Sequence, residues 1–377
     1  MPSFKLYTTY STKKANGAQD AVEGVGGAIG SPANAKRDVD NQQNTRRHWV
    51  RRQQGAPMSE RENPLPMPVV DAHMHFWDLS LGKHPWLCDE MIPFRYGDYS
   101  SIRRDYLVDD YLADARPFEV AATVYIEAEW DPADPLGELT WVHGLADRMG
   151  YPNAVAAQAW LDREDVADVL AGASAFPLVR SVRHKPAAAS TRDAARRGAP
   201  GSMDDPVWRD GFALLARHGL HFDLQTPWWH FDAAAELARD FPGTTIIVNR
   251  TGLPADRSAE GTAGGRAAME ALAAAPNVAV KISGIGLRGE RWDAAKNAAI
   301  VRDTLAIFGT ERCLFASNFP VDSLVGDLPA IFAGFGEITA DLPSEARNAL
   351  FRDNAARLYS IDLHSAAERR VTKGGPQ

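Results

Sequence analysis

Two histidines lie one residue apart in the segment VVDAHMHFWD, residues 69–78. In a β-strand, residues i and i+2 point to the same side, so His73 and His75 direct two imidazole rings at one place, with Asp71 below them. Such a pair can bind a metal ion or polarise a carbonyl oxygen through hydrogen bonds. An H-x-H also arises by accident in a chain with ten histidines, but the apolar run before this pair places it at the end of a strand and favours function.

Eight short apolar runs predict the scaffold that positions this pair. They are VVDAHMH (69–75), VAATVYIEAEW (120–130), NAVAAQAWLD (153–162), LVRSVRHKP (178–186), HFDLQTP (221–227), TTIIVNRTG (244–252), VAVKISGIG (278–286) and CLFASNFPVD (313–322). Runs that are apolar on both faces are typical of parallel strands buried under helices. Helical patterns occupy residues 134–150, 163–176, 204–219, 232–242, 265–276, 293–309, 328–342 and 343–359. This alternation predicts an α/β fold, a (β/α)8 TIM barrel, although a doubly wound open sheet has the same local pattern.

In such a barrel the active site lies at the carboxyl ends of the strands. The apolar runs end in residues able to do chemistry or bind a ligand: His73, His75, Glu127, Glu129, Arg183, His184, Gln225, Arg250, Ser283, Asn318 and Asp322. Endings of this kind on so many strands predict one shared pocket.

The opening motif, followed by HPWL (84–87), resembles the start of the amidohydrolase superfamily. It is most similar to the amidohydrolase-related branch that holds fuconolactonases and pyrone-dicarboxylate lactonases. VRHKP (182–186), NRTGLP (249–254), VKISGIG (280–286) and FASNFPVD (315–322) match later signatures of that branch in order, so the resemblance covers about residues 68–360. It implies a (β/α)8 barrel and hydrolysis of an ester or lactone ring.

Three positions depart from the metal-dependent members of that family. The fifth strand ends in Gln225, the sixth in Arg250 where relatives usually have His, and the eighth in Asn318 where many have Asp. A stable zinc site needs three or four N, O or S donors, and an arginine repels a cation. We therefore expect a metal-free site without a cofactor. One zinc ion on His73 and His75 is the alternative.

Asn318 also leaves the general base open, because an amide can orient a water molecule but cannot take its proton. Candidates are Asp322, Glu127 or a histidine of the pair. Asp322 has the alternative role of a turn or helix cap, and Glu127 that of a buried partner for Arg183.

Cations gather where the fourth strand ends, at Arg183, His184 and Lys185, and Arg250 adds another at the sixth. Arginine suits carboxylates, so this group indicates a small anionic substrate. The alternative is that these cations pair with acidic residues inside the barrel: Glu127, Glu129 and Asp223. Trp77 and the other tryptophans after strands could wall a ring-shaped substrate, or they could be core packing.

The composition and charge of the chain limit its possible partners and location. The net charge of −8 argues against nucleic acid as a partner, and no apolar stretch is long enough to predict a membrane span. Two cysteines fit a reducing cytoplasm. Residues 1–65 lack a sustained helical or strand period and predict a disordered tail, or an upstream start codon with Met58 as the true start. We expect the barrel to span 66–362 and a flexible tail to follow at 363–377; the oligomeric state is not indicated.

The leading hypothesis is a cytoplasmic, metal-free hydrolase of a small carboxylated lactone or related ester. In it, His73, His75 and Arg250 polarise the carbonyl, while Asp322 or Glu127 activates a water molecule that Asn318 orients. Arg183, with His184 or Lys185, holds the carboxylate, and Gln225 and Trp77 complete the pocket. Two alternatives remain: a zinc-dependent decarboxylase or hydratase-like member of the superfamily, and a non-catalytic ligand-binding barrel.

Overall fold

The computed structural model describes residue 65 and residues 67–372. The tail predicted at residues 1–65 lies outside this part of the chain except for Leu65, which is fully buried and belongs to the main hydrophobic core. Within the described residues, no helix is both long and apolar enough to cross a bilayer.

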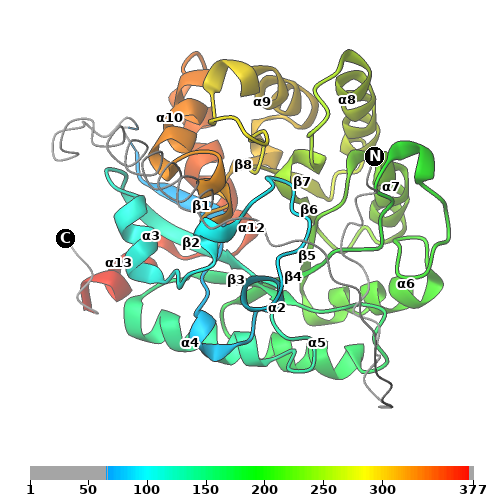
Figure 1. Cartoon of the computed structure of the whole chain (residues 1–377), viewed down its shortest axis with the longest axis horizontal. Helices are drawn as coiled ribbons and strands as arrows, with labels where there is room; N and C mark the ends of the chain where they lie inside the picture. Colours follow the sequence, from blue (N-terminus) through cyan, green and yellow to red (C-terminus); the bar gives the residue numbers. More distant parts are fainter. Residues whose placement is uncertain (1–64, 66, 373–377) are drawn as a thin grey trace, which may run out of the picture. The chain divides into compact units, whose positions relative to one another are not determined.

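Eight parallel strands form one sheet in sequential order, each strand paired with the next along the chain (Figure 1). They are β1 (Val69–Met74), β2 (Val120–Ile126), β3 (Ala154–Gln158), β4 (Val179–His184), β5 (His221–Leu224), β6 (Ile246–Val248), β7 (Val278–Ile282) and β8 (Cys313–Phe315). The first strand meets the segment after the last one through a parallel bridge between Met74 and Phe319. Sequential order with the ends in contact is a barrel, so the predicted (β/α)8 fold is confirmed and the doubly wound sheet is excluded.

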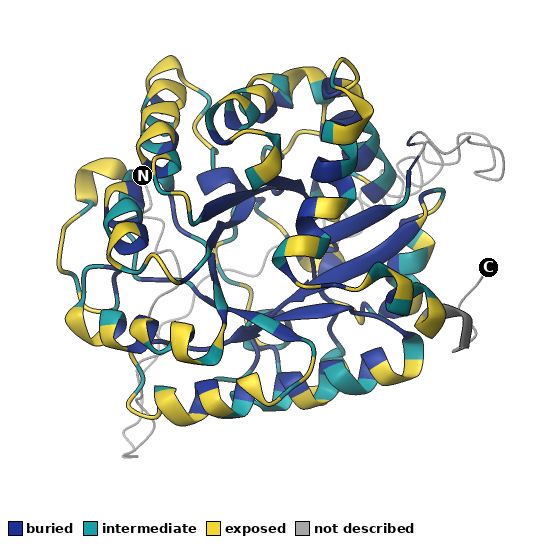
Figure 2. Cartoon of the chain, turned by 180° about the vertical axis from the view of Figure 1, so that it is seen from behind, coloured by how far each residue is buried: buried dark blue, intermediate teal, exposed yellow. Residues whose placement is uncertain are grey.

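Helices surround the strands (Figure 1). They are α2 (Pro85–Cys88), α3 (Val108–Asp114), α4 (Gly137–Met149), α5 (Val166–Ser174), α6 (Pro206–Ala213), α7 (Phe231–Asp240), α8 (Ala259–Ala273), α9 (Ala294–Phe308), α10 (Leu328–Ile338), α11 (Ser344–Asn348), α12 (Asn354–Leu358) and α13 (Leu363–Thr372), with a π-helical turn at Ala349–Asp353. Their outward faces are exposed while the strands are buried (Figure 2). In α6 the expected start signals are present, because the Asp205 side chain accepts a hydrogen bond from the Val207 N–H and Pro206 opens the helix.

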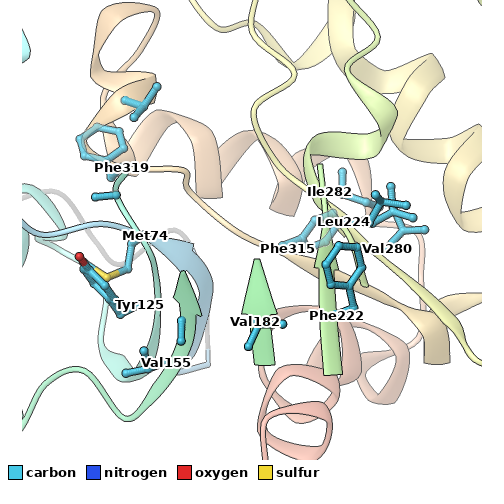
Figure 3. Close-up of a cluster of buried hydrophobic side chains, with 14 of the residues drawn as sticks. Met74, Tyr125, Val155, Val182, Phe222, Leu224, Val280, Ile282, Phe315 and Phe319 are labelled. Atoms are coloured by element: carbon cyan, nitrogen blue, oxygen red, sulfur yellow. The ribbon is translucent and has the colours of Figure 1, made fainter. Parts of the chain in front are cut away.

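Side chains that alternate along the strands form two separate hydrophobic clusters. The larger one packs strands against helices and includes Tyr125, Val155 and Phe222 (Figure 3). The smaller one joins alanines such as Ala122 and Ala156 with larger residues such as Ile247 and Leu314, and residues of these strands can meet only inside the barrel. The alanines leave room for the polar groups described below.

The end of the barrel differs from the expected flexible tail. Residues 363–372 form helix α13, and Ala366 in this helix is fully buried. Leu363 packs against the interior cluster next to Tyr359 and Ile361. Leu363 and Ala366 are three residues apart and lie on the same face of the helix, a signal too short to stand out in the sequence.

Candidate active site

Closure of the barrel positions the histidine pair. Asp71 in β1 accepts hydrogen bonds from the Ser317 N–H and hydroxyl at 2.9 and 2.5 Å and from the Tyr111 hydroxyl at 2.9 Å. The backbone adds two bonds, from the Asn318 N–H to the His73 carbonyl and from the His75 N–H to the Phe319 carbonyl, each 2.8 Å long. The strand has a register irregularity here, between Asp71 and Met74. Asp71 thus joins β1 to the segment after β8 and brings both imidazoles to the carboxyl end of the barrel.

Both imidazoles are buried and neutral. Their ring centroids are 5.1 Å apart. Burial first, and then the charges of Lys281, Arg183 and Arg250, lowers the pKa of His73 well below its usual value, and burial together with Arg183 and Arg250 does the same for His75. Neither ring carries a proton charge at neutral pH.

Hydrogen bonding fixes the tautomer of His75. Its Nδ1 lies 2.8 Å from the Ile126 carbonyl oxygen and must donate to it, so Nε2 presents a lone pair. This Nε2 and both ring nitrogens of His73 are buried without a partner among the described residues. His75 can therefore accept a proton or bind a metal, but it cannot donate to a carbonyl oxygen as the sequence-based hypothesis requires. The tautomer of a histidine depends on its hydrogen-bond partner, which strand alternation does not indicate.

Asn318 and Asp322 form one unit after β8. The Asn318 side-chain amide donates to Asp322 Oδ1 at 2.5 Å, and the Tyr96 hydroxyl donates to the same oxygen at 3.1 Å. Asn318 Oδ1 and Asp322 Oδ2 are buried and have no partner among the described residues. Burial raises the pKa of Asp322, although Arg95, Asn318, Arg250 and Tyr96 act in the opposite direction. A carboxylate with one free oxygen and a raised pKa suits a general base.

Arg250 lies in a strained turn directly after β6. Arg250, Thr251 and Leu253 have φ values of 54°, 52° and 58°, which non-glycine residues rarely adopt. The Arg250 side chain is 7% exposed, and its Nε has no hydrogen-bond partner among the described residues. Burial, then Arg95 and Arg183, lowers the pKa of Arg250, whose ordinary value is so high that it stays charged at neutral pH. The turn thus holds a buried cation close to Asp322 and the histidine pair.

Two of the expected substrate cations are ion-paired. Arg183 Nε donates to Glu127 Oε1 at 2.5 Å, and the other Glu127 oxygen accepts the Glu129 N–H at 2.7 Å. Gln225 accepts a weaker bond from Arg183 at 3.4 Å, and Lys185 pairs with Glu129. Of the two roles left open for Glu127, the contacts favour the partner of Arg183, because both of its oxygens are engaged. The same pairs lower the capacity of Arg183 and Lys185 to hold a substrate carboxylate.

His184 and Trp77, two of the predicted substrate-binding residues, are held by hydrogen bonds and ring contacts within the protein. His184 Nδ1 accepts hydrogen bonds from the Leu161 N–H and the Trp208 indole, both 3.0 Å long, and its ring stacks between Trp160 and Trp208. Trp77 is fully buried and donates to the Arg104 carbonyl at 2.7 Å. Arg183 and His184 are adjacent in β4, so they necessarily face opposite sides of the sheet.

A buried ion pair in the barrel interior was not assigned from the sequence. Lys281 Nζ lies 2.5 Å from Asp223 Oδ1, and the Tyr359 hydroxyl lies 3.0 and 2.9 Å from the two oxygens of the same carboxylate. All three side chains are fully buried. Burial lowers the pKa of Lys281 to about 8, while Asp223 acts to raise it. A lysine in the middle of the apolar run VAVKI was the available signal, because a buried charge requires a partner.

Arg95, Tyr96 and Arg257 were also missed, because they lie in loops well past the ends of β1 and β6. The described residues contain no group of three or more His, Cys, Asp or Glu side chains placed to hold a metal ion. The fold and these buried polar groups together define a TIM-barrel protein with a cluster of buried polar side chains at the carboxyl ends of its strands.

Comparison with known proteins identifies the family. The family model described as Amidohydrolase matches residues 70–361, so the chain belongs to this family of hydrolases. A protein of Sinorhizobium fredii, "Uncharacterized protein y4mH", is 39% identical over 293 residues, which cover 78% of this chain and 98% of that protein. L-fucono-1,5-lactonase of Burkholderia ambifaria is 27% identical over 306 residues, covering 78% of this chain and 97% of the lactonase. The resemblance seen in the sequence is confirmed.

Solved structures agree on the fold. An amidohydrolase from Burkholderia multivorans with bound HEPES has a TM-score of 0.65 at 23% identity and covers 78% of this chain and 100% of its own. A structure of an amidohydrolase from the same organism with bound zinc gives a TM-score of 0.64 at 22% identity, with the same coverage. At these identities the likeness concerns the fold alone.

Proposed function

We propose that this protein hydrolyses a small lactone or related ester ring and that it does so without a metal. The observation that carries the proposal is the set of buried polar atoms without partners among the described residues, which gathers at the carboxyl ends of the strands: His73 Nδ1 and Nε2, His75 Nε2, Arg250 Nε, Asn318 Oδ1 and Asp322 Oδ2. Folded proteins rarely leave such atoms unpaired unless a ligand or water satisfies them. The relatives named L-fucono-1,5-lactonase support a lactone as the substrate.

Asp322 is the proposed general base. Its free Oδ2 takes a proton from water as the water oxygen attacks the lactone carbonyl carbon. Its raised pKa brings it closer to neutral pH, whereas the lowered pKa of His75 makes that imidazole a weaker base. Asn318 keeps Asp322 in place through its amide and presents its own free oxygen as an acceptor for the water molecule.

Arg250 and His73 are the proposed donors to the carbonyl oxygen. The tetrahedral intermediate carries a negative charge there, and a buried guanidinium stabilises it strongly because the surroundings have low polarity. The ring C–O bond then breaks, and the ring oxygen takes the proton back from Asp322. The product is the open hydroxy acid, and Asp322 is again ionised.

A zinc ion fits the residues only in part. His75 is oriented as metal-ligating histidines commonly are, with its second nitrogen bonded to a carbonyl. His73 supplies a second nitrogen, but a stable zinc site needs three or four donors, and the cations Arg250 and Arg183 lie near both rings. The proposed reaction steps therefore use only the protein's own side chains and no metal. The orientation of His75 is the one feature that favours the alternative of a zinc-dependent decarboxylase or hydratase-like enzyme.

A lactone panel tests the proposal. Purified protein is mixed with L-fucono-1,5-lactone, other sugar lactones and 2-pyrone-4,6-dicarboxylate, and acid release is followed with a pH indicator against a blank without enzyme. Catalysed ring opening of at least one lactone is expected. If no lactone is opened although one of them raises the melting temperature, the protein is a non-catalytic ligand-binding barrel.

A further inference from the structure

Buried and half-buried cations around the pocket fall into two groups. Those on β4, directly after it, and on β7 have carboxylate partners: Arg183 with Glu127, Lys185 with Glu129, and Lys281 with Asp223. Around the loop that follows β7, Arg95, Arg250 and Arg257 have no ion pair with any described residue. Removing a cation from water without an ion partner is unfavourable, so the second group needs an explanation.

Arg95 and Arg257 bind successive carbonyl groups of the same loop. Arg95, in the loop after β1, donates through Nη2 to the Gly284 carbonyl at 2.6 Å and to the Gly286 carbonyl at 3.4 Å. Arg257, in the loop after β6, donates through Nη2 to the Ile285 carbonyl at 2.7 Å. The two guanidinium groups are therefore held at successive peptide groups of the loop after β7, next to each other in space.

Arg250 belongs to the same cluster. A Cβ atom on Gly284 would lie 2.9 Å from Arg250 Cγ, so the Arg250 stem crosses directly over the residue whose carbonyl Arg95 binds. Gly284 has a φ of +58°, and the absence of a side chain there permits this approach.

Each of these three arginines retains an unused donor. Arg95 Nη1, Arg250 Nε and Arg257 Nε are buried and have no hydrogen-bond partner among the described residues. The bonds they do make are to neutral oxygens, since the remaining partner of Arg257 is the Asn297 amide at 3.2 Å. Three positive charges are thus held close together with donors to spare, which is the arrangement that binds a carboxylate.

The cluster adjoins the proposed base. The Arg95 guanidinium lies 4.4 Å from the centre of the Tyr96 ring, and the Tyr96 hydroxyl donates to Asp322. Asp322 contributes one negative charge near three cations, and Glu290, which also acts on Arg257, is exposed and paired with Lys296. The local charge remains positive even when Asp322 is ionised.

We propose that Arg95 and Arg257, with Arg250 alongside, form an anion subsite that binds a carboxylate carried by the lactone away from its ester group. This assignment rests on the proposed lactonase function and narrows it to carboxylated lactones. The sequence predicted that Arg183 binds this carboxylate. Because Glu127 already occupies Arg183, we assign the contact to Arg95 and Arg257 instead. Arg95 and Arg257 act on binding and specificity, and neither touches the reacting carbonyl.

Direct binding tests the subsite without requiring turnover. Isophthalate, a ring dicarboxylate with no ester, is titrated into the full-length protein by calorimetry. Replacing one arginine by methionine, as Arg95→Met or Arg257→Met, should weaken binding by roughly 10–100-fold, the worth of one hydrogen bond to a charged group. Arg257→Lys keeps the charge and should lose less. Arg180→Met is the matched control. Arg180 lies at the amino end of β4, away from the candidate site, and donates hydrogen bonds to backbone carbonyls.

Kinetics then separate this proposal from the proposed function. D-glucaro-1,4-lactone and D-glucono-1,4-lactone carry, respectively, a carboxylate and a hydroxymethyl group at the same position. Arg257→Met should raise KM for the carboxylated lactone by at least tenfold, change its kcat little, and leave the neutral lactone unaffected. Equal effects on both lactones, or isophthalate binding that is unchanged in Arg95→Met and Arg257→Met, would overturn the subsite. If no lactone is hydrolysed but isophthalate binding depends on these arginines, the lactonase proposal fails and the subsite stands.

Discussion

Replacing Asp322 by asparagine separates catalysis from stability. The introduced amide has the same shape, and its oxygen can still accept the bonds that Tyr96 and Asn318 donate to Asp322 Oδ1. It cannot take a proton from water. General base catalysis contributes roughly 10²–10⁴-fold, so Asp322→Asn should lower kcat on the lactone substrate by about that factor.

The same substitution should stabilise the fold. Burial raises the pKa of Asp322 above its ordinary value of 3.8, and the opposing contributions of Arg95, Asn318, Arg250 and Tyr96 do not cancel this. A carboxyl group whose folded pKa is raised favours the fold below its unfolded pKa and loses that contribution as pH rises through the folded pKa. The amide does not ionise. The melting temperature of the variant should therefore equal that of the wild type near pH 4. It should exceed that of the wild type by a growing margin as the pH rises toward 8.

Two measurements test the predicted loss of activity and the predicted gain in stability. Initial rates are recorded across pH 4–9 with a pH-stat, and melting is followed by circular dichroism over the same range. In the wild type, kcat/KM should fall on the acid side as Asp322 becomes protonated, and the variant should lack this limb. Asp341→Asn, at an exposed carboxylate whose nearest cation Arg302 lies 3.6 Å away, is the control. A variant with wild-type kcat would refute the role of Asp322, and a variant that melts lower at pH 7 would show that its charge stabilises the fold.

Three further results follow from the structure. Arg250→Met should lower kcat by on the order of 10²–10³ without lowering the melting temperature, and Arg250→His should recover part of the rate; a change confined to KM would instead make Arg250 a binding residue. Lys281→Met should destabilise the protein by about 3–5 kcal/mol in urea unfolding, because it leaves Asp223 buried without its cation, and an unchanged midpoint would contradict that. Dialysis against a chelator should leave lactone hydrolysis intact, whereas stoichiometric zinc by elemental analysis with chelator-sensitive activity would promote the zinc-dependent alternative, with His73 and His75 as ligands.

The fold was predictable because its signals are local. Each apolar run is a strand or contains one, and the helix at Pro206–Ala213 begins at the cap that Asp205 indicated. The strands are shorter than the runs, however. The last strand spans only Cys313–Phe315, and the rest of that run forms the turn that carries Asn318 and Asp322. In a parallel barrel, apolar residues continue past the strand into the pocket, so composition alone does not mark the boundary.

The candidate site could be predicted only where its residues are close together in the sequence. The convergence of His73 and His75 follows from the alternation of a single strand. The same rule, applied to β4, would have separated Arg183 from His184, which share one run but face opposite sides. Partners that come from distant segments were beyond reach: Glu127 lies 56 residues from Arg183, and Arg95 lies 189 residues from Gly284. These contacts exist only once the barrel closes.

The distribution of unfavourable features indicates which side of the barrel mouth performs the chemistry. On the β2–β5 side, Glu129 also has a strained backbone, with a φ of 58°, but the charges of Arg183 and Lys185 are paired with neighbouring carboxylates. On the β6–β8 side, Arg250 occupies a strained backbone and lacks an ion partner, and Asp322 is buried with a free oxygen. Strain and unpaired charge both reduce stability, and proteins retain them mainly where a substrate compensates for them. The reacting ester should therefore lie between the histidine pair and the β6–β8 loops, with the paired cations forming the wall behind it.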